Sequence, residues 1–119
     1  MFTPNEYLKA VEEFKTKEMV EKCAISLIEK EMLEFAKAPR LPWIELIIPA
    51  KMGEELREKI SEKYVESGWS LVASTQAEQE TIFIFCTKEM MQDWFNFREK
   101  IGYDESVWNV VCRKEDVNG

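Results

Sequence analysis

The 119-residue chain contains no histidine, and its few glycines and cysteines are scattered. Without histidine it lacks the most common general base and the most common metal ligand. The four glycines stand apart, so there is no glycine-rich phosphate loop, and the three cysteines form no pair at metal-binding spacing. Because no nucleophile stands beside an obvious base, the sequence predicts a protein that is not an enzyme and that holds no cofactor and no metal.

Basic residues are also in short supply. Sixteen Lys and Arg against 23 Asp and Glu give a net charge of -7. Such a field repels nucleic-acid phosphates and anionic membrane surfaces at long range. No apolar stretch approaches the length that spans a bilayer, and residues 1–9 do not have the form of a signal peptide. We therefore expect no membrane association and no direct nucleic-acid binding, and a protein partner with a basic surface suits the charge.

Cysteine usage indicates the compartment. Cys23, Cys86 and Cys112 are an odd number, lie far apart and are set among apolar residues. This is a poor match to a disulfide framework and is typical of reduced cysteines in a core. The sequence therefore predicts a cytoplasmic protein.

Apolar and aromatic residues, in contrast, are plentiful. Hydrophobic residues make up 45% of the chain and aromatic residues 12%, which is enough for one packed core. We expect a single domain over 1–119. It divides into an N-terminal helical region (1–38), a core of strands and helices (43–112) and a polar tail (113–119).

The N-terminal region begins with a strong helix start, Thr3-Pro4-Asn5-Glu6, with Thr3 as N-cap and proline at the first helical position. Two apolar stripes follow, and the polar stretch 15–18 separates them with a change of phase. One straight helix over 4–38 would be about 50 Å long, far longer than a globule of this size. We therefore expect a bend near Thr16 that gives two helices. The alternative is one projecting helix that packs against a second copy, which would make a homodimer.

The core reads as strand, helix, strand, strand, helix, strand. The run Thr81-Ile82-Phe83-Ile84-Phe85-Cys86 suits a strand buried on both faces, at the centre of a sheet. Gly68 and Gly102 stand where the two helices should end. The expected segments are strands at 43–48, 69–74, 81–87 and 107–112, and helices at 51–67 and 88–101.

This order predicts an α+β fold with a ferredoxin-like βαββαβ sheet of four strands in the order 4-1-3-2. Strands one and three, the most apolar, would lie in the middle. Both crossover helices would cover one face, and the N-terminal helical region would cover the Phe83 and Phe85 face. Helices are thus expected on both faces of the sheet.

Three other functions can be compared with parts of the sequence. Aromatic residues on a central strand invite comparison with the RNA-recognition motif, but 80–85 lacks its basic and glycine positions. An enzyme would need a carboxylate as its base, and Glu45, inside an apolar strand, is an example of such a candidate. Four tryptophans could line a pocket for a planar ligand, so a small-ligand or nucleotide-binding protein is the alternative to a protein-binding one: Trp43, Trp69, Trp94 and Trp108.

Acidic residues gather where the expected topology brings three loops to one end of the sheet. These loops are the turn after strand one, the hairpin between strands two and three, and the loop before strand four. Such a cluster could steer association with a basic site. The candidate partner-binding residues are Glu54, Glu55, Glu78, Glu80, Asp104 and Glu105.

Several segments together resemble small uncharacterised acidic proteins of tailed bacteriophages. The resemblance covers residues 16–87 and rests on the Lys/Glu-rich helix, Ile44-Glu45-Leu46-Ile47-Ile48-Pro49, Tyr64-Val65-Glu66-Ser67-Gly68-Trp69 and Thr81-Ile82-Phe83-Ile84-Phe85. The resemblance implies a protein that binds and blocks a host or antiviral-defence protein. It assigns no role to any individual residue of this chain.

Overall fold

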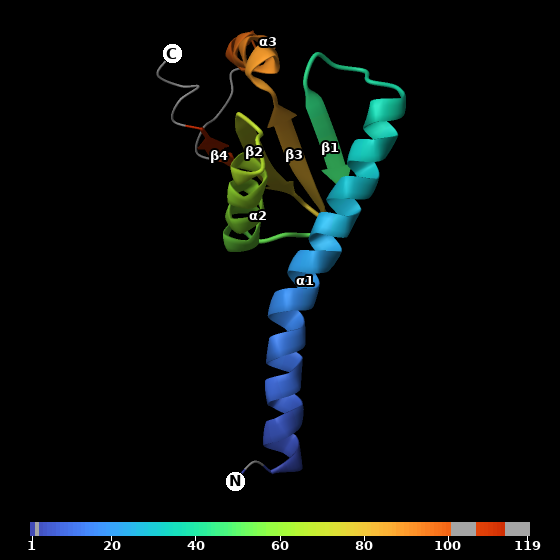
Figure 1. The fold of residues 1–119 in the computed structure, drawn as a ribbon, viewed down its shortest axis with the longest axis vertical. Helices are drawn as coiled ribbons and strands as arrows, with labels where there is room; N and C mark the ends of the chain where they lie inside the picture. Colours follow the sequence, from blue (N-terminus) through green and yellow to red (C-terminus); the bar gives the residue numbers. More distant parts are fainter. Residues whose placement is uncertain (2, 101–106, 114–119) are drawn as a thin grey trace.

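The computed structural model describes residues 1, 3–100 and 107–113, and the side chains of all of these except 11–20 and 100. The described chain is α+β, with α-helices on both faces of a four-stranded sheet, as the sequence predicts (Figure 1). In chain order the elements are α1 (Pro4–Lys37), β1 (Ile44–Ile48), α2 (Glu54–Glu66), β2 (Leu71–Ala77), β3 (Glu80–Cys86), α3 (Lys88–Lys100) and β4 (Asn109–Cys112).

α1 is one continuous helix of 34 residues, so the predicted bend near Thr16 is wrong. The helix starts as expected, because the Thr3 hydroxyl accepts a hydrogen bond from the Glu6 backbone N–H and the Glu6 carboxylate accepts one from the Thr3 N–H. The polar stretch 15–18 changes the phase of the apolar stripe but contains neither glycine nor proline, so the backbone continues. The N-terminal half projects beyond the sheet and gives the molecule a long axis of 58 Å against 31 and 26 Å (Figure 1).

All strand pairs of the sheet are antiparallel, and the order is β1-β3-β2-β4. β3 is central, as predicted, and it pairs with β1 and β2. The predicted ferredoxin-like order is wrong in one respect, because β4 pairs with β2 and leaves β1 at the edge. In this order β2 has a neighbour on each side and its residues 71–74 are fully buried, whereas Ile47 on the edge strand β1 is 53% exposed.

The new strand order also changes which face each crossover helix covers. The β1-α2-β2 and β3-α3-β4 crossovers step in the same direction across the sheet, although β1 and β3 run in opposite directions. Right-handed crossovers therefore place α2 and α3 on opposite faces. The prediction that both lie on one face is wrong, and α2 instead shares a face with α1.

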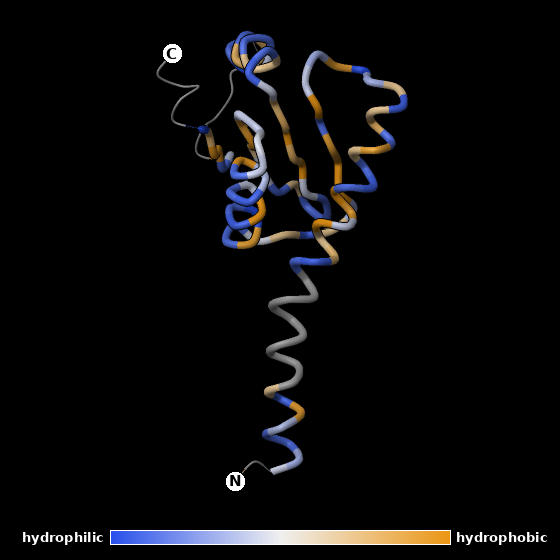
Figure 2. The backbone as a smooth tube through the Cα atoms, viewed as in Figure 1, coloured by the Kyte–Doolittle hydropathy of each residue, from blue (hydrophilic) through white to orange (hydrophobic). Residues whose placement is uncertain are grey.

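Two apolar clusters fill the layers on either side of the sheet. Phe83 and Phe85 are fully buried in the cluster that Ala24 and Ile28 of α1 help to form, so α1 covers the predicted face. The Tyr64 ring of α2 meets Phe85 edge-on, with centroids 5.0 Å apart. On the other face, buried strand residues pack against α3, and Figure 2 shows apolar positions along β1 and β3. The cluster contains Trp43, Leu71, Ala73, Ile84, Cys86, Met91 and Trp94.

Polar contacts join α1 to α2 at the margin of the first cluster. The Glu21 carboxylate of α1 forms ion pairs with two lysines of α2. Its Oε2 lies 3.1 Å from Lys59 Nζ, and its Oε1 contacts Lys63 Nζ. These two cations hold the pKa of Glu21 below its usual range, with Lys63 the larger cause. The Tyr64 hydroxyl donates a hydrogen bond of 3.0 Å to Glu29. Together these contacts fix the point at which α1 leaves the body of the molecule.

The cysteines follow the prediction only in part. All three are free thiols, with Cys86 buried and Cys112 half-buried, but Cys23 is exposed on α1. Burial raises the pKa of Cys86 to about 12.

Among the described residues, no helix has both the length and the apolar character needed to cross a bilayer.

Candidate functional site

The structure brings four of the six predicted partner-binding residues to one end of the sheet. Glu54 and Glu55 occupy the first turn of α2, and Glu78 and Glu80 lie in the β2–β3 hairpin. These elements meet because the last residue of β1, Ile48, pairs with Thr81 beside the hairpin. All four glutamates are exposed. Asp104 and Glu105 lie outside the described residues.

Glu54 has a structural role in addition to its position at this end. Its carboxylate accepts a hydrogen bond of 3.1 Å from the Asn109 amide of β4. The Asn109 oxygen in turn accepts one of 2.7 Å from Arg57, which also donates to the Met52 carbonyl oxygen at 2.9 Å. Arg57 is only 6% exposed, and burial lowers its pKa. The Glu54–Asn109–Arg57 network therefore ties α2 to β4, which the sequence could not show because it did not give this strand pairing.

Glu78 sits at the tip of the hairpin in an unusual backbone conformation. The register pairs Ala77 with Glu80, so the loop between the strands has two residues. Glu78 has a φ of 41°, in the left-handed region that favours glycine. A glutamate here carries backbone strain, and the hairpin holds its exposed side chain at the outermost point of this end.

Of the elements that the structure describes, α3 alone packs on the face of the sheet opposite α1, and it covers the half that lies away from the hairpin. Near α3 the strand residues Leu71, Ile84 and Cys86 are fully buried. Toward the hairpin, Ile47 of the edge strand β1 is 53% exposed; on the opposite edge strand β4, Val110, which pairs with Ala73, is 39% exposed. Cross-strand pairing places Ile47 beside Ile82 and Ile82 beside Thr75 in one row. We call Ile47, Ile82, Thr75 and Val110 the open half-face.

Carboxylates border the open half-face. Glu45 and Glu80 are two residues from Ile47 and Ile82 on their strands, so their side chains lie on the same face of the sheet. Glu78 is close to Glu80, at the hairpin tip. Sequence reasoning identified Glu78 and Glu80 but not the apolar row beside them, because the ferredoxin-like topology put the cover of two crossover helices on this face. An apolar surface with an acidic margin suits a partner segment with apolar and basic side chains.

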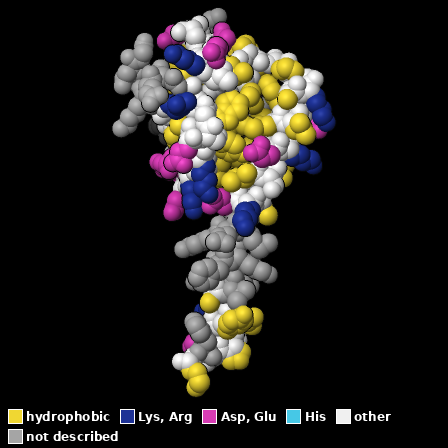
Figure 3. Space-filling model, in the orientation of Figure 1, with side chains coloured by type: hydrophobic (Ala, Val, Ile, Leu, Met, Phe, Trp, Pro, Cys, Tyr) yellow, Lys and Arg dark blue, Asp and Glu magenta, His cyan; other side chains and the backbone are white. Residues whose placement is uncertain are grey.

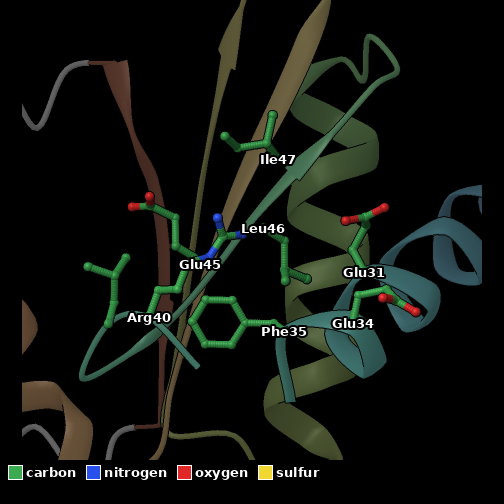
Figure 4. Close-up of a pocket in the computed structure, with 8 residues that line it drawn as sticks. Glu31, Glu34, Phe35, Arg40, Glu45, Leu46 and Ile47 are labelled. Atoms are coloured by element: carbon green, nitrogen blue, oxygen red, sulfur yellow. The ribbon is translucent and has the colours of Figure 1, made fainter. Parts of the chain in front are cut away.

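A cavity of about 500 Å³ lies between the C-terminal part of α1 and β1. In Figure 4, Glu31 and Glu34 project on one side of Phe35, and Arg40 and Glu45 lie on the other side. Leu41, Leu46 and Ile47 complete the lining. Glu45, the predicted candidate for a base, is thus a partly buried residue at the margin of this cavity. Three carboxylates and one guanidinium give the cavity a polar wall of net negative charge.

A second cavity of about 230 Å³ is almost wholly apolar and lies where α1 meets the start of α2. Ala24, Leu27, Met52 and Leu56 are among its lining residues. Figure 3 shows apolar surface on the body of the molecule on this side. Within the described ranges, no group of three or more metal-ligating side chains is arranged to hold a metal ion.

The four tryptophans do not form a ligand pocket, because they are divided between the two faces. Trp43 packs edge-on against Trp94, with centroids 5.6 Å apart, and Trp94 packs against Trp108 at 5.7 Å. Trp69 lies on the opposite face against Phe85, at 5.5 Å. These rings are parts of the two cores, and none lines either of the cavities described above.

The chain was compared with protein-family models, with curated proteins and with solved structures, and none of the three comparisons finds a match.

Proposed function

We propose that this chain is a non-enzymatic acidic protein that binds a protein partner by covering a basic and apolar surface. The observation that carries the proposal is the open half-face with its carboxylate margin. Ile47 is 53% exposed on the edge strand β1, and Glu45 and Glu80 share its face of the sheet. Exposed Ile47 beside half-buried Ile82, in a chain of net charge -7, favours a partner with apolar side chains and opposite charge.

The mode of action follows from the chemistry that this surface offers. A surface of apolar and carboxylate groups can occupy a partner's site without changing it chemically, and that is how an inhibitor acts. Basic partner sites commonly hold nucleic-acid phosphates, which carboxylates can replace electrostatically. The resemblance to acidic phage proteins supports a host or antiviral-defence protein as the partner. We therefore propose an inhibitor of such a protein.

The experiment is quantitative affinity capture from host lysate with two variants of equal charge change. Glu78→Lys/Glu80→Lys alters the acidic margin, and Glu58→Lys/Glu62→Lys alters exposed residues of α2 away from it. The proposal expects the captured partner to fall at least tenfold for the first variant and to be retained by the second. For the purified partner, the first variant should also bind more slowly, with a weaker dependence on salt. Equal capture by both variants, with melting temperatures near the parent value, would contradict the proposal.

The alternative is a small-ligand binder that uses the cavity between α1 and β1. Its size of about 500 Å³ is sufficient for a metabolite. However, Glu31, Glu34 and Glu45 outnumber Arg40 in its wall, which disfavours a phosphate-bearing nucleotide and favours a cationic ligand. A thermal-shift panel of nucleotides and polyamines separates these functions, because a bound ligand raises the melting temperature. A rise that Phe35→Ala abolishes would establish the small-ligand function.

A further inference from the structure

The N-terminal half of α1 presents apolar side chains to solvent far from the body of the molecule. Tyr7 and Leu8 are each 60% exposed, although they follow a complete capping box. Figure 3 shows hydrophobic side chains near this end of the helix, and Figure 1 shows it extending away from the sheet. The segment therefore carries an apolar stripe of its own.

This stripe does not continue the one that packs on the sheet. Ala24 and Ile28 mark the side of α1 that faces the body, and both are buried. At 100° per residue, the midpoint of Tyr7 and Leu8 lies roughly 130° around the helix from the midpoint of Ala24 and Ile28. The body of the same chain therefore cannot cover the N-terminal stripe, so its partner is another molecule.

The length of the projecting segment also calls for a partner. Residues 4–20 form about 25 Å of helix, and most helical stability in proteins comes from packing of an apolar face. The capping box contributes about 1 kcal/mol, which supports the first turn only. Packing of the apolar stripe on a partner would stabilise the remaining turns.

Charge indicates which partner fits. Residues 4–20 carry three lysines and four glutamates, a net charge of -1 out of the -7 of the whole chain. A basic partner would be drawn to the body, where most of the negative charge lies. A second copy is repelled least along this nearly neutral segment. Antiparallel packing further places the two acidic bodies at opposite ends, whereas parallel packing would bring them side by side.

We propose that the projecting half of α1 pairs with the same segment of a second copy in an antiparallel homodimer. Two helices in contact over about 25 Å bury an area near the low end of specific interfaces, about 1,000 Å². The dimer should therefore dissociate in the micromolar range. This proposal is independent of the open half-face, which stays accessible in both copies.

The first test is analytical ultracentrifugation of the full chain from 1 to 100 μM, compared with Tyr7→Glu/Leu8→Glu. Glutamate near a helix N-terminus is favourable, so the variant should keep its helix content by circular dichroism. The matched control is Leu33→Glu, on the same helix at 62% exposure but within the body. The proposal expects at least tenfold weaker dimerisation for the double variant and no change for the control. A monomer throughout, or equal weakening by both, would overturn it.

The second test fixes the orientation through Cys23, the one exposed cysteine. A spin label there reports the separation of the two copies by double electron–electron resonance. Antiparallel pairing centred on 4–20 separates the two labelled positions by about 30 Å along the axis, whereas parallel pairing brings them within about 15 Å. A distance near 30 Å that disappears in Tyr7→Glu/Leu8→Glu supports the proposal, and a short distance overturns the antiparallel dimer.

Discussion

The packing of α1 on the Phe83 and Phe85 face predicts a large loss of stability on truncation of Ile28. This side chain is 0% exposed within the cluster that joins α1, α2 and the sheet. Ile28→Ala removes three carbon groups, which at about 0.8 kcal/mol each gives roughly 2.4 kcal/mol of lost burial. The cavity left behind adds to this, and the expected total is about 3–4 kcal/mol. For a domain whose whole stability is about 5–15 kcal/mol, the change is easily measured.

Urea unfolding followed by tryptophan fluorescence is a suitable assay for this change. The midpoint should fall while the slope of free energy against urea stays the same, because the surface exposed on unfolding is unchanged. Leu33→Ala provides the control on the same helix, and its 62% exposure predicts a change within about 0.5 kcal/mol. If Ile28→Ala cost less than about 1 kcal/mol with an unchanged slope, α1 would not form part of the core.

Three further predictions concern single side chains. Glu78→Gly should raise the free energy of unfolding, measured by urea titration, by up to about 1 kcal/mol, because glycine adopts a positive φ without strain. A loss of stability would contradict this prediction. Arg57→Ala should lower the free energy of unfolding by about 1–3 kcal/mol, because it removes two hydrogen bonds in a buried site. A change below about 0.5 kcal/mol would show that the Glu54–Asn109–Arg57 network is not needed for stability. The lowered pKa of Glu21 means that its pairs with Lys59 and Lys63 stabilise the fold above the ordinary glutamate pKa and are lost as pH falls through the lowered value. The stabilities of the parent and of Glu21→Gln should therefore converge as the pH is lowered below the ordinary glutamate pKa. A difference that stays constant with pH would refute the pairing.

Much of the fold could be predicted from local pattern. The capping box at Thr3 and the apolar run 81–86 identify their elements without tertiary information, and the structure has a helix and a central strand at these positions. The α+β class followed from the order of the elements. These features depend on hydrogen bonds and periodicity within one segment, which the sequence carries directly.

The neighbour of β4 could not be predicted in the same way. Its residues Val110 and Val111 can pair with either free edge, and the right-handed crossover rule is satisfied by both arrangements. The choice depends on how deeply β2 and β1 are buried in the complete fold, which no local pattern measures. The open half-face follows from that choice, so the apolar part of the candidate site was missed. The acidic part was found because the end at which each loop lies does not depend on strand order.

The β2–β3 hairpin also has a consequence for how the chain folds. Among the described strands, it is the only pair whose members are joined by a tight turn, since the β1–β3 and β2–β4 pairs each enclose a helix. Closing the short loop costs the least entropy, so we expect the hairpin to form first. During synthesis β4 emerges after all the other strands, and until then β2 is an unprotected edge with the apolar run Leu71-Val72-Ala73. That edge can pair with other nascent chains. Pulse-labelling hydrogen exchange would reveal this order as early protection of β2 and β3 amides facing each other and late protection of those facing β4.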